Sequence, residues 1–176
     1  MRIEINKLSS KYKVKELKAS DAAAVLKLEC TNPLYFEYCP PTPNIQSVLD
    51  DMKALPPKKS LEDKYYIGFF EEKELIAIMD LILYYPNEDT AFIGLFMVLS
   101  DKQGTGVGTE IIGECFSELR EIGFSAIRLG YMKGNSQSAA FWNKNNFIPK
   151  GIEIDNGQGT VVIMERQLCY MNLSLQ

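Results

Sequence analysis

Three glycines alternate with two other residues between a run of strand-forming residues and a run of helix-forming residues. The segment reads Gln103-Gly104-Thr105-Gly106-Val107-Gly108, and it lies between the apolar stretch 90–99 and a helical pattern that extends to Ile122. Glycine adopts positive φ readily and adds no side chain, so such a turn leaves the first N–H groups of the helix open to a ligand. The helix dipole adds positive potential at the same point, and the segment therefore predicts a site for a phosphate or pyrophosphate.

Other glycine-rich phosphate loops do not fit this spacing. A P-loop needs Lys and then Ser or Thr after its last glycine, and neither pair follows Gly108. A dinucleotide or methyltransferase loop needs an acidic residue at the end of the next strand, and the predicted strand 125–132 contains no Asp or Glu. The spacing thus favours a different class of phosphate-containing ligand.

The segment Gln103–Gly108 resembles the [QR]-x-x-G-x-[GA] signature of the GNAT superfamily of acyl-CoA-dependent N-acetyltransferases. A second segment, Asn135–Phe147, is similar to that family's N-x-x-A-x-x-[FL]-Y-x-K-x-G-F motif, and Leu95–Leu99 resembles its fourth strand, which is splayed at a bulge. The resemblance is strong over roughly residues 95–151 and weak before about residue 60. Two motifs joined by a helix and a strand in the right order are more specific than a glycine loop alone.

The resemblance implies one N-acetyltransferase (GNAT) domain over residues 1–176. Its expected class is α/β (α+β), with a mixed, mostly antiparallel sheet of six to seven strands, about four flanking helices, and a splay between the fourth and fifth strands. Periodicity and turn residues predict strands at 12–17, 64–70, 75–85, 90–99, 125–132, 147–154 and 160–168, and helices at 22–30, 45–55, 104–122 and 135–145. The proline-rich stretch 31–44 is expected to form a cleft wall without helix, and the apolar strand 90–99 is expected to be buried on both faces.

Acetyl-CoA is the cosubstrate that the resemblance implies. Its pyrophosphate would bind the N–H groups of the glycine turn, its pantetheine arm would lie along the strand at 96–98, and the N–H of Met97 or Val98 would polarise the thioester carbonyl. The implied cofactor-binding residues are Phe96, Met97, Val98, Gln103, Gly104, Thr105, Gly106, Val107, Gly108, Thr109, Asn135, Ser138, Phe141, Trp142 and Lys144.

The sequence departs from the family at the acid and base positions. Trp142 stands where many relatives have a tyrosine, and an indole N–H is too weak an acid to protonate a thiolate. The strand 90–98 also has no Glu to serve as a base. The candidates that remain are Tyr131, Glu37, Asp80 and Tyr35, and catalysis by proximity with water as the proton relay is a further alternative. The aromatic residues Tyr35, Phe36 and Tyr38 are candidate acceptor contacts, or simply an apolar wall.

Composition narrows the chemistry and the partners. The 176 residues include no histidine, and the spacings of the four cysteines match no zinc pattern, so we expect no metal and free, buried thiols. A net charge of −4 and a pI near 5.0 argue against nucleic acid and anionic membranes as partners, and favour cationic amines. No apolar run reaches the roughly 20 residues that span a bilayer, and residues 1–10 lack a signal-peptide core, so we expect a cytoplasmic protein.

Two function classes remain open at this point. The first is an N-acetyltransferase that acts on a primary amine of a small molecule, peptide or protein, with polyamines, aminoglycosides and exposed lysines as the first choices. The second is a catalytically weak, GNAT-like module that binds CoA as a sensor or interaction partner. A homodimer through exposed strand edges is a further expectation.

Overall fold

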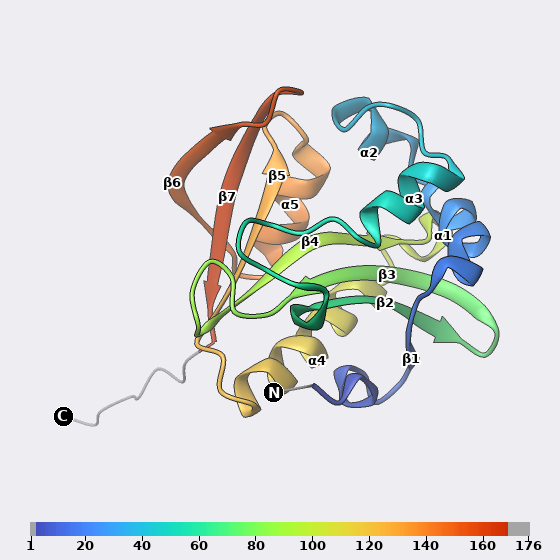
Figure 1. Cartoon of the computed structure of the whole chain (residues 1–176), viewed down its shortest axis with the longest axis horizontal. Coiled ribbons are helices and arrows are strands. Elements are labelled where there is room, and N and C mark those ends of the chain that lie inside the picture. Colours follow the sequence, from blue (N-terminus) through green and yellow to red (C-terminus); the bar gives the residue numbers. More distant parts are fainter. Residues whose placement is uncertain (1–2, 169–176) are drawn as a thin grey trace.

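The computed structural model describes residues 3–168, which form one seven-stranded sheet with helices on both faces (Figure 1). The strands are β1 (Lys13–Glu16), β2 (Lys64–Glu71), β3 (Glu74–Ile82), β4 (Thr90–Val98), β5 (Ala126–Met132), β6 (Ile148–Asp155) and β7 (Thr160–Gln167). The α-helices are α1 (Ala22–Glu29), α2 (Pro33–Tyr38), α3 (Ile45–Asp51), α4 (Val107–Glu121) and α5 (Ser136–Lys144). Short 3-10 helices are η1 (Ile5–Leu8), η2 (Ala19–Asp21), η3 (Leu61–Asp63) and η4 (Ser100–Lys102).

The strand order in the sheet is β1-β2-β3-β4-β5-β7-β6. Neighbouring strands are antiparallel except β4 and β5, which run parallel and pair only from Thr90 with Ala126 to Ile93 with Leu129. Beyond Ile93 the two strands diverge (Figure 1). A mixed sheet with this splay confirms the predicted fold class.

The expectation that β4 is buried on both faces is wrong for the middle of the strand. Gly94 is exposed, and Leu95 and Phe96 are only partly buried. The pairing of β3 with β4 shifts between Asp80 and Leu81, which leaves Gly94 as an extra, bulged residue in β4. The strand therefore bends away from β5 and presents its middle to an open space.

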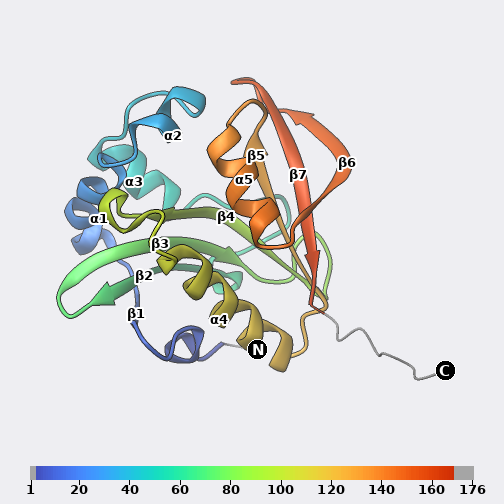
Figure 2. The ribbon, with the colours of Figure 1, turned by 180° about the vertical axis from the view of Figure 1, so that it is seen from behind.

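Two apolar clusters hold helices to opposite faces of the sheet. The larger cluster contains the inner side of α4, with Ile111, Cys115 and Leu119, together with Trp142 of α5. The smaller cluster lies under α1 and α3 and contains Val25, Leu28 and Val48 with sheet residues Tyr66, Ile78 and Met97. Figure 2 shows α4 and α5 together in front of the sheet, on the side opposite α1 and α3.

The proline-rich stretch contains a helix that was not expected. Pro33 begins α2, because proline suits the first helical position, where its missing N–H has no intrahelical role. Pro40 and Pro41 follow the helix and prevent its extension. In the next helix, α3, the apolar pattern runs on to Leu55, but the helix ends at Asp51.

The free-thiol prediction holds for the described cysteines, but the predicted burial holds only for Cys115. Cys115 is fully buried in α4, Cys39 is half-buried and Cys30 is exposed. Cys30 is the C-terminal cap residue of α1 and is exposed to solvent there. Cys169 lies outside the described residues.

No helix within residues 3–168 combines the length and the apolar character that crossing a membrane requires.

Substitution of Ile127 by alanine tests the short contact between β4 and β5. Ile127 is fully buried and pairs with Ala91, so we expect Ile127→Ala to lower the free energy of unfolding by about 2–4 kcal/mol, measured by urea denaturation. Ile148→Ala on the edge strand β6 is the matched control, because Ile148 is 64% exposed and its loss should change stability by less than about 0.5 kcal/mol. Equal losses for the two variants would contradict this assignment of the core.

Candidate functional site

A cleft of about 240 Å³ opens where β4 and β5 diverge. Its walls come from β4, the glycine turn before α4, the start and inner face of α5, and the segment from Asn32 into α2. The lining residues are Asn32, Tyr35, Phe96, Met97, Val98, Gln103, Gly104, Gly106, Gly108, Thr109, Asn135, Gln137, Ser138, Phe141, Trp142 and Lys144. Among the predicted cofactor-binding residues, only Thr105 and Val107 are outside this lining, since the Thr105 hydroxyl donates to the Lys102 carbonyl and Val107 packs on the core.

The glycine turn exposes a row of backbone donors. Within the described residues, the N–H groups of residues 104–109 make no hydrogen bond, and the first bond of the helix runs from Glu110 N–H to the Gly106 carbonyl. Gly104 and Gly106 have φ of +74° and +96°, as predicted, and a Cβ on either would meet no atom within 4 Å. These donors lie at the positive end of the fifteen-residue helix α4, so the turn can bind an anion through its backbone.

Gly108 serves close packing. A Cβ at this position would come within 3.1 Å of the Phe141 ring and 3.4 Å of Val98 Cγ2. The third glycine therefore brings α4 close to α5 and to the end of β4.

The backbone of β4 presents alternate peptide groups to the cleft. Leu99 N–H donates to the Ile76 carbonyl on β3, and polar backbone groups of successive residues point to opposite sides of a strand. The Val98 groups therefore point away from β3, and the Val98 carbonyl accepts bonds from Asn32 Nδ2 and Gln103 Nε2. By this alternation, Met97 N–H faces β3 and Val98 N–H faces the cleft.

A chain of side-chain amides crosses one end of the cleft. Gln137 Nε2 donates to Gln103 Oε1 at 3.2 Å, and Gln103 Nε2 donates to Asn32 Oδ1 at 2.6 Å. This chain joins α5, the glycine turn and the segment between α1 and α2. Asn32 and Gln137 were not predicted as site residues, because neither belongs to a motif and their roles depend on this tertiary contact.

Aromatic rings form the apolar wall of the cleft. Phe96 stacks on Phe141 with ring centroids 5.8 Å apart, and Trp142 packs against Phe141 at 4.9 Å and Phe147 at 5.1 Å. Trp142 is almost completely buried, since only 7% of its surface is exposed. Its surroundings are those of a packed core residue that contributes one edge to the cleft.

Polar groups from α5 complete this side of the cleft. Asn135 is buried, and its Oδ1 accepts from Ser138 N–H, which caps the helix. Ser138 is half-buried and Lys144 is exposed, and both line the cleft. Lys144 is the lining residue with a cationic side chain.

The predicted acid and base candidates lie in different places. Tyr35 lines the cleft, and burial, together with the nearby Cys39, Asp51 and Glu29, raises the pKa of its phenol, which stays protonated. Tyr131 is half-buried on β5, Glu37 is exposed on α2, and Asp80 is buried on β3, and none of these three lines the cleft. Of the other predicted acceptor contacts, Phe36 packs in the smaller apolar cluster, edge-on to Tyr35 with centroids 5.0 Å apart.

Helix α2 is tied to the opposite side of the cleft. Tyr38 Oη donates to the Gly134 carbonyl at 3.0 Å, next to the lining residue Asn135, and Gln158 Nε2 donates to the Pro40 carbonyl at 2.8 Å. Figures 1 and 2 show the corresponding approach of α2 to the turn between β6 and β7. These bonds join α2 and the segment after it to the turns that follow β5 and β6.

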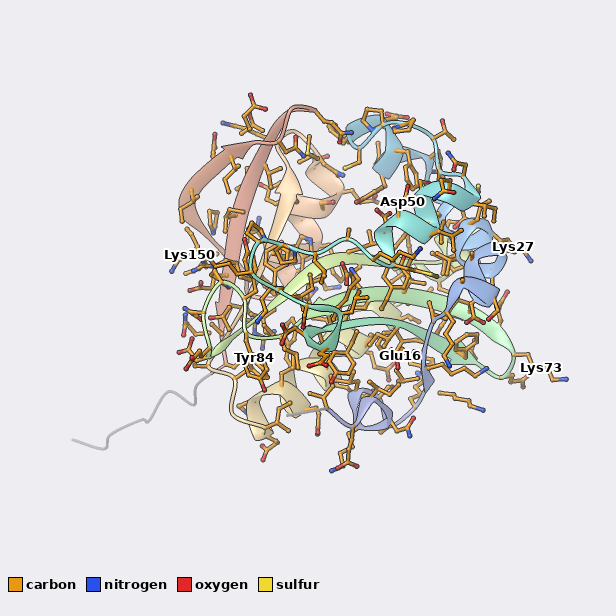
Figure 3. The ribbon with its side chains drawn as sticks, in the orientation of Figure 1. Glu16, Lys27, Asp50, Lys73, Tyr84 and Lys150 are labelled. Atoms are coloured by element: carbon orange, nitrogen blue, oxygen red, sulfur yellow. The ribbon has the colours of Figure 1, made fainter. Side chains whose placement is uncertain are left out.

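A buried polar cluster lies behind Tyr35, under α1 and α3. It contains a salt bridge in which Lys64 Nζ donates to Asp80 Oδ2 at 2.7 Å and to the Ala54 carbonyl at 2.9 Å. Both side chains are largely withdrawn from solvent. Asp80 also occupies the space beside the bulge, because a Cβ on Gly94 would lie 2.5 Å from its Oδ2. Figure 3 labels Asp50, which lies near the C-terminal end of α3, next to Asp51.

Two more carboxylates adjoin this cluster, on the buried Glu29 and on Asp51, which is exposed at the end of α3, and neither forms an ion pair with another described residue. Glu29 is 2% exposed, and burial, with Asp51 nearby, raises its pKa from an ordinary value of 4.5 to about 7. Desolvation also raises the pKa of Asp51. The positive charge of Lys64 lowers this pKa, and the negative charge of Asp50 raises it further. No hydrogen bond or ion pair is formed by the Glu29 side chain to the described part of the chain.

Two further polar atoms in the cluster have no partner among the described residues. They are Tyr66 Oη and Asp80 Oδ1, on residues that are 4% and 8% exposed. Tyr66 interacts electrostatically with Glu29, Asp51 and Asp80, and burial raises the pKa of its phenol. No sequence pattern indicated this cluster, because its five residues are spread over four separate elements, α1, α3, β2 and β3.

No group of three or more histidine, cysteine or acidic side chains within residues 3–168 is arranged to hold a metal ion. The acidic cluster behind Tyr35 therefore does not have the geometry of a metal site.

Comparisons with known proteins agree with this geometry. A family model described as the acetyltransferase (GNAT) family matches residues 30–147. A search among curated proteins found no match.

Solved structures share the fold at low sequence identity. An acetyltransferase from Thermus thermophilus is 20% identical, with a TM-score of 0.72, and the match covers 89% of this chain and 97% of that one. A PaiA N-acetyltransferase from Thermoplasma acidophilum, solved in complex with coenzyme A, is 17% identical, with a TM-score of 0.65 and coverage of 89% and 98%. The ribosomal-protein-S18-alanine N-acetyltransferase from Escherichia coli is 14% identical, with a TM-score of 0.63 and coverage of 94% and 99%.

Glu29→Gln should stabilise the fold, and more so at high pH. The pKa of Glu29 is higher in the folded chain than in the unfolded chain, so the folded state holds an extra proton and loses stability as the pH rises from about 5 to above 7. Glutamine has no such cost, and a shift from 4.5 to about 7 corresponds to at most about 3 kcal/mol. Thermal unfolding at pH 5 and pH 8 measures the difference between the variant and the wild type.

The matched control is Glu37→Gln, which removes an exposed carboxylate from α2 and should change the melting temperature little at either pH. A Glu29→Gln variant that is less stable than wild type at pH 8 would show that the carboxylate has a stabilising partner.

Proposed function

Because this chain belongs to the GNAT family of acetyltransferases and is an acyltransferase, we propose that it transfers an acetyl group from acetyl-CoA to a primary amine by direct attack. The observation that carries the proposal is the row of N–H groups at residues 104–109 that make no hydrogen bond within residues 3–168, beside a cleft that follows the edge of β4 where β5 has diverged. One arrangement then binds the anionic tail of the cosubstrate and aligns its thioester.

The glycine turn binds the pyrophosphate of acetyl-CoA in this proposal. Backbone donors at a helix N-terminus favour a phosphate through hydrogen bonds and through the helix dipole. The Thr109 hydroxyl, in the first turn of α4, and the Lys144 ammonium, at the end of α5, add polar and cationic contacts from the same cleft. The PaiA N-acetyltransferase was solved with coenzyme A and has the same fold, which supports this placement.

The pantetheine arm extends along β4 as a short additional strand. The unpaired edge at residues 96–98 offers backbone groups, and the rings of Phe96 and Phe141 cover its apolar atoms. Of the two N–H groups considered from the sequence, strand alternation favours Val98, because Met97 N–H faces β3. Val98 N–H then stabilises the oxyanion that develops on the thioester carbonyl.

The chemical step is the attack of a neutral amine on the thioester carbon. The amine lone pair forms the new C–N bond, the C–S bond breaks, the nitrogen loses a proton and the CoA thiolate gains one. The titratable side chains that line the cleft are Tyr35 and Lys144. The Tyr35 phenol stays protonated because burial raises its pKa, so water carries the proton from the amine, and proximity supplies much of the rate enhancement.

The second candidate function is a CoA-binding module with little turnover. One observation favours it. Trp142 is a packed core residue, at the position where many relatives have a tyrosine that can act as an acid. Thiol release from acetyl-CoA, measured with and without an amine panel, separates the two. Release that depends on an amine supports the transferase, while tight CoA binding without release on any amine supports the module.

Gly106→Ala should weaken CoA binding by about tenfold or more. Gly106 has a φ of +96°, so alanine there moves the turn away from the geometry that presents its N–H groups. Isothermal titration calorimetry with CoA measures the change.

Gly123→Ala is the matched control at the other end of α4. Gly123 has a φ of +105° and the same open surroundings, so both variants should lose about 1 kcal/mol of stability. Only Gly106→Ala should lose affinity for CoA, and an equal loss in the control would contradict the proposed anion site.

Tyr131→Phe and Glu37→Gln should each reduce kcat by less than about tenfold. Neither side chain lines the cleft, and a positioned acid or base typically contributes 10²-fold or more. Steady-state kinetics on an accepted amine measures the effect. A loss of several hundredfold in one variant, with an unchanged melting temperature, would identify that residue as the missing acid or base.

A further inference from the structure

The polar cluster behind Tyr35 takes no part in binding acetyl-CoA, and its charges do not balance. It contains three carboxylates, on Glu29, Asp51 and Asp80, and one ammonium, on Lys64. Lys64 already donates hydrogen bonds to Asp80 and to the Ala54 carbonyl, so Glu29 forms no ion pair with a cation among the described residues. Buried carboxylates in proteins are usually paired, because an unpaired one is costly to ionise.

Unpartnered polar atoms point to a missing partner in the same place. Glu29 is 98% buried without a hydrogen bond from the described residues, and Tyr66 Oη and Asp80 Oδ1 are buried acceptors without a donor there. Glu29, Tyr66 and Asp51 also interact electrostatically with one another. An alkylammonium group has three N–H donors and one positive charge, so it would satisfy this set of acceptors.

The cluster lies beside the cleft and is set back from it. Tyr35 is shared, because it lines the cleft and interacts with Glu29 and Asp51. Met97 is also shared, since it lines the cleft and packs with Leu28 and Tyr66 in the smaller apolar cluster. Glu29, Asp51 and Tyr66 themselves do not line the cleft, so a group bound to them is separate from the amine that reacts at β4.

We propose that Glu29, Asp51 and Tyr66 form an acceptor-specificity site that binds a second ammonium group of the acceptor, so that the preferred acceptors are linear alkyl diamines or polyamines. The inference rests on the proposed function and specifies its acceptor. One amine reaches the thioester beside Val98 as the neutral nucleophile, and the other remains protonated at Glu29.

Glu29, Asp51 and Tyr66 have distinct roles in this site. The Glu29 carboxylate supplies the charge that pairs with the ammonium, and Tyr66 Oη accepts one of its N–H bonds. Asp51, at the more exposed end of α3, adds negative potential. Asp80 is held by Lys64 and sets the position of the cluster against the bulge at Gly94.

The experiment compares 1,5-diaminopentane with pentylamine, a chain of equal length and one charge fewer, as acceptors for wild type and Glu29→Gln. In the wild type, kcat/KM should be about 10-fold to 100-fold higher for the diamine, as expected for a hydrogen-bonded ion pair at a buried site. In Glu29→Gln the advantage should fall to within about threefold, through a higher KM for the diamine and with little change for pentylamine. Glu37→Gln, with an exposed carboxylate on α2, should keep the wild-type preference.

Tyr66→Phe provides a second test that removes only a hydroxyl. It should raise the KM for the diamine severalfold and leave the melting temperature at or above the wild-type value, because the hydroxyl has no partner among the described residues. Equal use of diamine and monoamine by the wild type, or a preference that survives Glu29→Gln, would overturn the proposal.

Calorimetry of 1,5-diaminopentane with the CoA complex separates failure of this inference from failure of the proposed function. Binding that is lost in Glu29→Gln supports the specificity site even if no acetyl group is transferred, and in that case the transferase function fails alone. Thiol release with other amines, without diamine binding, overturns the specificity site and leaves the transferase function intact.

Discussion

Pairing between β4 and β5 ends after Ile93, and the arrangement of the site follows from that limit. A strand inside a sheet normally has partners for its N–H and C=O groups on both sides, and β4 loses one set for the rest of its length. The bulge at Gly94 and the close packing at Gly108 set the direction of the strand on either side of this stretch. The result is a strand edge without a neighbouring strand, followed after a short turn by a helix N-terminus whose N–H groups make no hydrogen bond within the described residues.

The proposed function assigns different kinds of recognition to the two sides of the cleft. On the side of α4 and β4, backbone groups supply most of the polar contacts, and the side chains that line the wall are mainly aromatic or small. On the side of α1 to α3, recognition depends on side chains, with Tyr35 in the cleft and carboxylates behind it. Backbone recognition suits a cosubstrate that is constant across a family, and side-chain recognition allows the acceptor to differ from one relative to another.

Sequence analysis predicted the elements that short, local patterns encode. The glycine turn and the helices predicted over 104–122 and 135–145 each depend on residues a few positions apart, and the structure has these helices at Val107–Glu121 and Ser136–Lys144. Helix α2 was missed because prolines were interpreted only as helix breakers, although Pro33 occupies a first helical position. The burial of β4 was overestimated because its apolar composition does not reveal where its neighbour leaves.

The polar cluster was beyond sequence analysis for a physical reason that also bears on its role. Glu29 follows the apolar face of α1 and reads as an ordinary helix-end charge, and only the packing of α1 and α3 on β2 and β3 buries it near Asp51 and Asp80. If the cluster served stability alone, Lys64 or another cation would be expected to neutralise Glu29. Instead Lys64 is fixed on Asp80, and the cost of the remaining charge falls on the folded state. Proteins retain such local costs where a ligand relieves them, and a cation bound beside the cleft would relieve this one.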